Sequence, residues 1–511
     1  MMGSRSQHLR EALRQVDDAM ARGDLAAAES LARRIVAGNP LAAPAQFSLG
    51  IAVQASGRFE QAEPHLARAV TLDGQNTNYR LNYGLCLLSM GRVPEAAVQY
   101  GKAREIAPKS FETAWRYGSF QSRIGHMEEA LASLEQALAK APEQARPAIR
   151  LDMLECLLSL GRIEDAEQLI ARHLESTPFR ARYVCLLSST RKHDADSMMF
   201  RMVEQELASS RLSSLDRSDL MIRRGVMLQN SRRFDEAFDS FVAGKKLLKA
   251  PSVTAAFTRE VEQRIARFDR DSMEQLQARY GRSEYAPIFV LGLPRSGTTL
   301  AAQIISAHSR AGNAGELETM TYVAAKFSGM ASEEAASALA TLYEKTLRYV
   351  VPDKELAVDK MPLNFRFIAE AAILFPKARF VHCTRHAADT FISALQTEMN
   401  AAHSYSYDPA DYAAYHKQYR RLMEHWGQVL PGRVFDLSYE RLVIEPEPTI
   451  NALLDYLGLD PEEACFHPER NKGAVATFSR LQVRLGINTG SVARWKPYER
   501  HLGPILAESE S

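Results

Sequence analysis

The sequence contains few cysteines, and their arrangement suggests neither a disulfide framework nor a metal site. Its five cysteines, Cys86, Cys156, Cys185, Cys383 and Cys465, are odd in number and scattered along the chain. None belongs to a C-x-x-C pair or has a histidine at metal-ligand spacing. Such residues are most simply buried, reduced thiols. We therefore expect no structural disulfide and no bound metal.

The sequence also lacks a long apolar run and an excess of charge of either sign. Its main apolar stretch, from Ala286 to Leu293, is far shorter than the roughly 20 residues that a membrane-spanning helix needs. The segment from Met1 to Arg10 is polar and contains no apolar signal core. The formal charge at pH 7 is only +1, which does not indicate a nucleic-acid partner. These absences predict a cytoplasmic protein without a membrane span.

A length of 511 residues exceeds what one hydrophobic core usually holds, and the first half of the chain repeats itself. Small residues recur every 34 positions in four rows, which are Gly23, Gly57, Gly91 and Gly125; Gly50, Gly84 and Gly118; Ala28, Ala62, Ala96 and Ala130; and Ala69, Ala103 and Ala137. Pro40, Pro108 and Pro142 stand where a unit should end. Proline cannot continue a helical hydrogen-bond ladder, so each unit is predicted to end there.

Each unit is expected to contain two short helices, because small residues at helix crossings let the backbones approach closely. The four rows resemble the tetratricopeptide repeat family over residues 9–178. This resemblance implies an N-terminal α-solenoid. A further repeat-like unit is expected near residues 219–251, within a helical region over 179–280. The segment from Phe179 to Arg217 is helical in composition but falls outside the repeat register.

A solenoid of stacked repeats presents a concave face. We expect this face to hold a peptide or protein partner, which could be the substrate of the second half of the chain. A purely structural arm is the alternative that the sequence leaves open.

The second half alternates short apolar runs with helical patterns, which predicts a parallel α/β sheet over residues 285–505. Strands are expected at 286–292, 355–358, 378–383 and 433–437. The first strand leads into Gly292-Leu-Pro-Arg-Ser-Gly297-Thr-Thr, which has the glycine spacing of a nucleotide P-loop. Backbone N–H groups at such a helix start bind phosphate or a similar oxyanion. Thr298 replaces the lysine of a triphosphate-binding loop, which disfavours an ATPase or kinase.

The segment Pro294-Arg-Ser-Gly-Thr-Thr-Leu300 resembles the 5′-phosphosulfate loop of sulfotransferases, in the form found in the tyrosylprotein sulfotransferase branch. The resemblance assigns Arg295, Ser296, Gly297, Thr298 and Thr299 to a P-loop-like donor site. It implies an enzyme that uses 3′-phosphoadenylyl sulfate (PAPS) without a metal and sulfates a hydroxyl of a peptide, glycan or lipid, with tyrosine among the candidate acceptors.

A second segment, Val381-His-Cys-Thr-Arg-His-Ala-Ala-Asp-Thr-Phe-Ile-Ser393, resembles the family's 3′-phosphate motif, in which a strand is followed by arginine and then by serine. Arg385 can bind a phosphate bidentately, and the hydroxyl of Ser393 can complete the contact. Near the C-terminus, Gly490-Ser491-Val-Ala-Arg-Trp-Lys496 resembles the segment that closes over the donor. Ser491 is the candidate contact there, and Arg484 and Lys496 are candidates for a cationic rim.

The resemblance also implies which residues act on the transferred group. Gly315-Glu316 matches the segment whose glutamate is the base, so Glu316 is the predicted base, with Glu318 and the histidines His308, His382 and His386 as alternatives. Val358-Asp-Lys360-Met-Pro resembles the segment whose lysine contacts the sulfuryl group. Lys360 and Arg295 are therefore predicted to offset negative charge on the leaving group.

Two other functions stay open at this point. One is a catalytically inactive repeat scaffold that binds a nucleotide or a protein partner, and the other is a P-loop kinase. A homodimer is compatible with the family, but no residue pattern indicates one.

Overall fold

The computed structural model describes residues 2–399, 401–471, 473–475 and 482–509. The chain divides into two compact units. The first comprises Met1–Met153, Leu317–Lys326 and Leu342–Val350, and the second comprises Leu154–Glu316, Phe327–Thr341 and Val351–Ser511. Within the described ranges, no helix is both long and apolar enough to cross a membrane. The five cysteines are buried, as expected.

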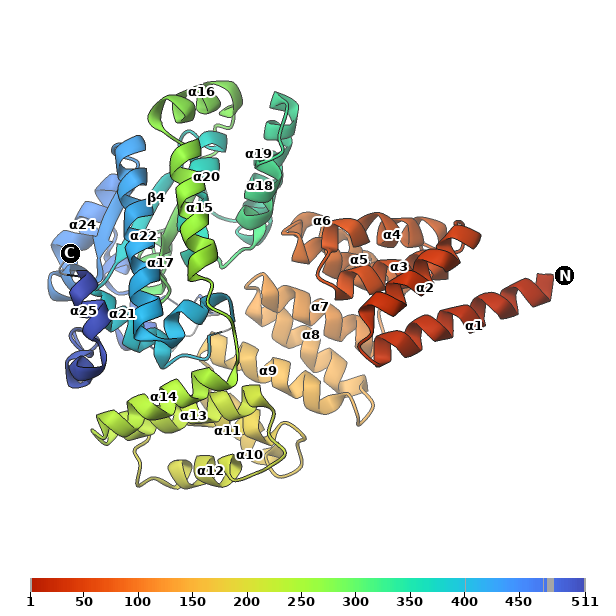
Figure 1. Ribbon diagram of the computed structural model, residues 1–511, viewed down its shortest axis with the longest axis horizontal. Helices are drawn as coiled ribbons and strands as arrows, with labels where there is room; N and C mark the ends of the chain where they lie inside the picture. The colour runs from red at the N-terminus through yellow and green to blue at the C-terminus, as the bar shows by residue number, and fades with distance from the viewer. Residues whose placement is uncertain (1, 400, 472, 476–481, 510–511) are drawn as a thin grey trace. The chain divides into compact units, whose positions relative to one another are not determined.

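The first unit contains helix pairs that follow the sequence repeat (Figure 1). They are α1 (Met2–Ala21) with α2 (Leu25–Gly38), α3 (Ala43–Ala55) with α4 (Phe59–Leu72), α5 (Thr77–Ser89) with α6 (Val93–Ile106), and α7 (Phe111–Arg123) with α8 (Met127–Lys140). Pro40, Pro108 and Pro142 each come just after the second helix of a pair. The predicted solenoid of tetratricopeptide repeats is confirmed.

The first row of glycines lies in the turns within the helix pairs. Gly57, Gly91 and Gly125 have φ angles of 74°, 69° and 86°. In this left-handed region a side chain is strained, so glycine is the residue that fits best. Gly161 (φ 76°) takes the same place in the next pair, and Arg232 (φ 62°) takes it in a later one.

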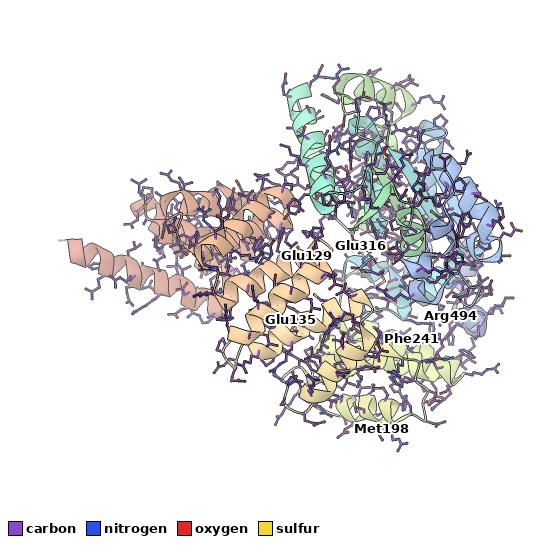
Figure 2. All side chains as sticks on the ribbon, turned by 180° about the vertical axis from the view of Figure 1, so that it is seen from behind. Glu129, Glu135, Met198, Phe241, Glu316 and Arg494 are labelled. Carbon is purple, nitrogen blue, oxygen red and sulfur yellow. The ribbon has the colours of Figure 1, made fainter. Side chains whose placement is uncertain are left out.

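The second row of glycines lies where two helices cross. A Cβ atom at Gly50 would lie 2.6 Å from the Leu66 side chain. The pattern returns in the second unit, where a Cβ at Gly225 would lie 2.4 Å from the ring of Phe241, labelled in Figure 2. The two rows of glycines therefore have different causes. The first row permits the turns, and the second row permits close contact between helices.

Helix α9 (Arg146–Leu160) has residues in both units, and the second unit continues with further helices. They are α10 (Ile163–His173), α11 (Arg180–Thr190), α12 (Met198–Leu207), α13 (Ser214–Asn230), α14 (Phe234–Leu247), α15 (Thr254–Arg267) and α16 (Arg270–Tyr280). Residues 191–197 separate α11 from α12, a longer connection than in the regular pairs. This longer connection explains why the repeat register is lost between Phe179 and Arg217.

The described part of the second unit also contains a five-stranded parallel sheet with the strand order β2-β3-β1-β4-β5. The strands are β1 (Ile288–Gly292), β2 (Ala311–Gly315), β3 (Leu356–Lys360), β4 (Arg379–Thr384) and β5 (Val434–Ser438). The predicted combination of a helical solenoid and an α/β domain is confirmed. Strand β2 was not predicted, because its sequence Ala-Gly-Asn-Ala-Gly has little strand propensity and pairing with β3 imposes the extended conformation.

Helices cover both faces of the sheet (Figure 1). On one face, Ile304 of α17 and Leu453 of α24 share a core with Val381 of β4. On the other, Phe289 stacks on Phe380, and Trp426 of α22 donates a hydrogen bond to the Phe365 carbonyl. The helices after β1 are α17 (Thr298–Ser306), α18 (Thr319–Phe327), α19 (Glu333–Val350), α20 (Ile368–Leu374), α21 (Ala387–Leu395), α22 (Pro409–Val429), α23 (Tyr439–Ile444), α24 (Pro446–Leu457) and α25 (Gly503–Ser509). The short 3₁₀ helices are η1 (Pro362–Phe367), η2 (Ala401–Tyr407), η3 (Glu463–Phe466), η4 (Pro468–Arg470), η5 (Gln482–Leu485) and η6 (Lys496–His501).

Candidate active site

The turn after β1 is shaped to expose backbone N–H groups at the start of α17. Gly292 and Gly297 have φ angles of 142° and 102°. A Cβ at Gly292 would lie 2.5 Å from the Cys383 carbonyl oxygen, and one at Gly297 would lie 2.7 Å from the ring of Tyr439. Neither position has room for a side chain. The turn leads directly into α17, which begins at Thr298. At this helix N-terminus the backbone N–H groups and the helix dipole favour an anion.

A cavity of about 210 Å³ adjoins this turn in the second unit. Most of the predicted site residues line it, namely Arg295, Gly297, Thr298, Thr299, Glu316, Arg385, Ser393 and Ser491. Two others lie next to it. Ser296 is buried, and its Oγ has no hydrogen-bond partner among the described residues, while Lys360 is ion-paired with Glu316.

Arginine side chains converge on the cavity. Burial lowers the pKa of the Arg295 guanidinium, and the positive charges of Arg385 and Arg494 lower it further. The pKa of Arg494 is likewise lowered by its burial and by Arg385. Buried cations that repel one another favour the binding of an anion, because an anion would neutralise them.

Hydrogen bonds hold Arg295 and Arg385 in fixed positions. Arg295 Nε donates to Ser393 Oγ at 3.0 Å, and Arg385 Nη1 donates to the Arg295 carbonyl oxygen at 3.0 Å. Arg385 also donates to the Ser491 carbonyl and lies 4.7 Å above the centre of the Tyr439 ring. The buried Arg385 Nε has no partner among the residues that the structure describes. It is therefore a donor that a ligand could satisfy.

The Glu316 carboxylate and the Lys360 ammonium form an ion pair at the cavity. Lys360 is the last residue of β3 and is only 1% exposed, whereas the Glu316 side chain is 40% exposed. Glu316 follows β2 directly and precedes α18, so it does not lie on a helix. A partly exposed carboxylate can accept a proton from a bound hydroxyl, and the buried ammonium beside it can stabilise negative charge.

The C-terminal segment is fastened over α21. Asp389 accepts hydrogen bonds from the backbone N–H groups of Ala493 (2.7 Å) and Trp495 (2.9 Å). The Trp495 indole stacks on His386 with ring centres 5.1 Å apart. These contacts place Ser491 in the cavity wall and Arg494, labelled in Figure 2, beside the other arginines.

The histidines considered as alternative bases do not line the cavity. His308 bonds to the Asp460 carbonyl and Glu462, and His382 bonds to Asp436 and Tyr419. His386 lies under Trp495 instead. Glu318 is exposed and belongs to the other compact unit.

The expected cationic rim is made by other residues than predicted. Arg484 donates to the Ser159 carbonyl at 3.0 Å and packs against Gly161, and neither Arg484 nor Lys496 lines the cavity. Arg494, which lies between Ser491 and Lys496 in the C-terminal motif, does not line the cavity either, but it is close enough to Arg295 and Arg385 to lower the pKa of Arg295. Its position could not be predicted from the sequence, because only the fold shows which cation of this segment lies near Arg385.

The structure also adds residues that the sequence analysis did not assign. Tyr439 and Val443 of α23 both line the cavity. His403 lines it as well, from η2. No motif marks His403, and only the tertiary structure brings it to the site.

Comparisons with known proteins agree with this geometry. Residues 287–463 match the model of the sulfotransferase family. Residues 13–76, 49–110 and 125–189 match models of tetratricopeptide repeats. The chain therefore carries a sulfotransferase-family domain together with tetratricopeptide repeats.

Individual relatives are distant. An uncharacterized protein of Aquifex aeolicus is 28% identical over 401 residues, which cover 74% of this chain and 52% of that protein, so the chain spans about half of its length. Protein-tyrosine sulfotransferase 1 of Danio rerio is 24% identical, over 41% of this chain and 65% of that protein. The sulfotransferase domain of the Synechococcus PCC 7002 olefin synthase is 20% identical, with a TM-score of 0.34, over 42% of this chain and 90% of that structure.

Proposed function

We propose that this protein is a sulfotransferase that transfers the sulfuryl group of PAPS to a hydroxyl of a peptide, glycan or lipid acceptor. The observation that carries the proposal is one cavity that is lined by Arg295, Arg385 and Glu316, with Arg494 close to both arginines and Lys360 ion-paired with Glu316. This arrangement combines an anion site with a proton acceptor.

The described residues fit a donor that carries two separate phosphate positions. The turn at Gly297 and the start of α17 suit one oxyanion, and Arg385 with Ser393 suits another. The unsatisfied Ser296 Oγ and Arg385 Nε are polar atoms that such an anion could engage. A triphosphate fits less well, because Thr298 stands where a triphosphate-binding loop has lysine.

When bound, the donor supplies an activated sulfuryl group with a phosphate as leaving group. Glu316 accepts the proton of the acceptor hydroxyl while a new bond forms from the hydroxyl oxygen to sulfur. Lys360 and Arg295 stabilise the negative charge that gathers on the leaving phosphate as its bond to sulfur breaks. Because Lys360 is ion-paired with Glu316, the same ammonium also holds the carboxylate in place.

The repeats are proposed to hold a macromolecular acceptor. In the first unit, a groove of about 260 Å³ is lined by Tyr100, Trp115, Arg116 and Phe120, among others. Trp115 Nε1 donates to Asp152 at 2.6 Å, so the indole is fixed in the groove. If the groove binds the acceptor, Trp115→Ala in the full chain should raise KM for that acceptor and leave the KM for PAPS unchanged. Equal KM values for the acceptor in the wild type and in Trp115→Ala would show that the groove does not select the acceptor.

The donor class is tested by calorimetric titration of the full-length protein. The ligands are 3′-phosphoadenosine 5′-phosphate, and ATP with and without magnesium. We expect tight binding of the bisphosphate without a metal and weak binding of ATP. A preference for ATP with magnesium would support a P-loop kinase and overturn the proposal. Binding of the bisphosphate without any sulfuryl transfer from PAPS would support an inactive scaffold.

A further inference from the structure

His403 occupies an unusual place in the cavity wall. It belongs to η2, and its φ of −110° and ψ of 22° depart from helical values. Residues in this bridge region of backbone conformation are sparse, and active-site residues are often found there. His403 lines the same cavity as Glu316.

The two ring nitrogens of His403 have different surroundings. Nδ1 is buried and has no hydrogen-bond partner among the described residues. The ring packs edge-on against Tyr405, with centres 6.1 Å apart. A neutral imidazole carries its proton on one nitrogen only, and a buried N–H without a partner is costlier than a buried lone pair. The tautomer with the proton on Nε2 is therefore favoured, and the residue itself lines the cavity.

Burial keeps the imidazole of His403 neutral. Burial lowers the pKa of His403 to about 4, although Glu316 favours protonation, and Lys245 of α14 opposes it. At neutral pH the ring can then donate one hydrogen bond, but it is a poor base. Its role differs for this reason from that of Glu316.

Anchors on both sides fix the position of η2. Ser404 Oγ donates to the Pro251 carbonyl at 2.7 Å, and the Tyr405 ring stacks on Tyr415 with centres 3.8 Å apart. Tyr407 OH donates to the Met399 carbonyl at 2.9 Å. A side chain held in this way can make a directional contact with a ligand.

We propose that His403 is a catalytic residue whose Nε2–H donates a hydrogen bond to the acceptor oxygen. This inference rests on the proposed sulfotransferase function. The acceptor hydroxyl then donates to Glu316, accepts from His403, and directs its remaining lone pair at sulfur. As the new bond from the acceptor oxygen to sulfur forms, the bond from sulfur to the bridging oxygen breaks, and that oxygen leaves with the donor phosphate. The hydroxyl proton passes to Glu316, and His403 keeps its own proton.

The first test compares side chains that imitate one ring nitrogen each. The amide nitrogen of glutamine can replace Nε2–H, whereas that of asparagine can replace only Nδ1. With PAPS as donor and 4-nitrophenol or water as acceptor, His403→Asn should lower kcat about 10-fold or more, and His403→Gln should stay within about 3-fold of the wild type. Binding of 3′-phosphoadenosine 5′-phosphate should be unchanged in both. The matched control is His425→Gln on α22, because His425 does not line the cavity and bonds to the Phe268 carbonyl instead.

Equal losses in the Asn and Gln variants, or none in either, would overturn the proposal for His403. A second measurement needs no turnover. In full-length protein labelled with ¹⁵N-histidine, the signal that disappears in His403→Gln should be that of a neutral Nε2–H tautomer from pH 5.5 to 8. A charged ring or an Nδ1–H tautomer would refute the assignment. Failure of the sulfotransferase function itself would be recognised separately, since the wild type would then neither bind the bisphosphate nor consume PAPS.

Discussion

Two groups of buried charges in the second unit differ in how they are neutralised. Beside α11 and α13, Arg182 lies 3.1 Å and Arg223 lies 2.7 Å from the carboxylate oxygens of Glu398, and Arg182 also pairs with Asp219 at 3.3 Å. Burial raises the pKa of Glu398, but Arg223 and Arg182 outweigh it and keep this pKa below its ordinary value. Around the cavity, by contrast, Arg295, Arg385 and Arg494 repel one another.

The difference separates structural charges from binding charges. Opposite charges around Glu398 neutralise one another within the protein, and each depends on its partners for stability. The cavity arginines are held by carbonyl and hydroxyl groups, and their charge can be balanced by an anionic ligand. Substitutions in the first group should therefore change folding stability, and those in the second should change binding or catalysis.

The largest expected effect is on stability, from Glu398→Ala. Removing this carboxylate leaves Arg182 and Arg223 without their shared partner, and breaking a buried pair of this kind costs about 3–5 kcal/mol. Urea unfolding should show a loss of this size. The control is Glu424→Ala on the exposed side of α22, where only a 3.9 Å pair with Arg420 is lost and the change should be below about 0.5 kcal/mol. A loss for Glu398→Ala no larger than for the control would contradict the structural role.

The next effect is on catalysis, from Glu316→Gln. This variant keeps the size of the side chain but removes the proton acceptor. Transfer from PAPS should fall by on the order of 10², equivalent to about 2.7 kcal/mol, while the Kd of 3′-phosphoadenosine 5′-phosphate stays nearly the same. Steady-state kinetics and calorimetry measure the two quantities. Normal turnover in this variant would mean that another group is the base.

A smaller effect is expected on binding, from Arg385→Ala. This variant should weaken the binding of 3′-phosphoadenosine 5′-phosphate by about 10- to 30-fold, which corresponds to about 1.5–2 kcal/mol, the lower part of the range for hydrogen bonds to a charged group. Adenosine 5′-phosphate, which lacks the 3′-phosphate, should lose much less affinity. Stability should change little, because relief of the repulsion from Arg295 offsets the loss of the hydrogen bonds to the Arg295 and Ser491 carbonyls. If both ligands were weakened equally, Arg385 would not recognise the 3′-phosphate.

The smallest effect is expected from Arg484→Ala. Arg484 belongs to the same C-terminal region as Arg494, but it bonds to the Ser159 carbonyl rather than lining the cavity. Its loss should cost about 1 kcal/mol of stability and leave the Kd of the bisphosphate within about 2-fold. A much larger change in Kd would mean that Arg484 contributes to the donor site. Bonding to a carbonyl outside the cavity would then not separate structural arginines from those that bind the donor.

Local constraints made much of the architecture predictable. Gly57, Gly91 and Gly125 recur because each helix turn needs a positive φ, and Gly50 recurs because a second helix lies against it. Both requirements return in each repeat, so the glycines recur in the sequence at the spacing of the repeat. Strand β2 was missed for the opposite reason, since its extended form comes from pairing with β3 and not from its own residues.

The sequence by itself determined the repeat solenoid, the parallel α/β domain and the positions of the two motifs at Gly297 and Arg385 that are proposed to bind anions, because turn geometry and phosphate contacts require particular residues at fixed spacing. Only the tertiary structure decided that His403 lines the cavity, that Arg494 lies close to Arg385, and that Arg484 bonds elsewhere. These side chains belong to segments in which no fixed spacing between residues marks a role. The direction in which each one points depends on distant contacts, such as those of Asp389 with Trp495 and of Ser404 with Pro251.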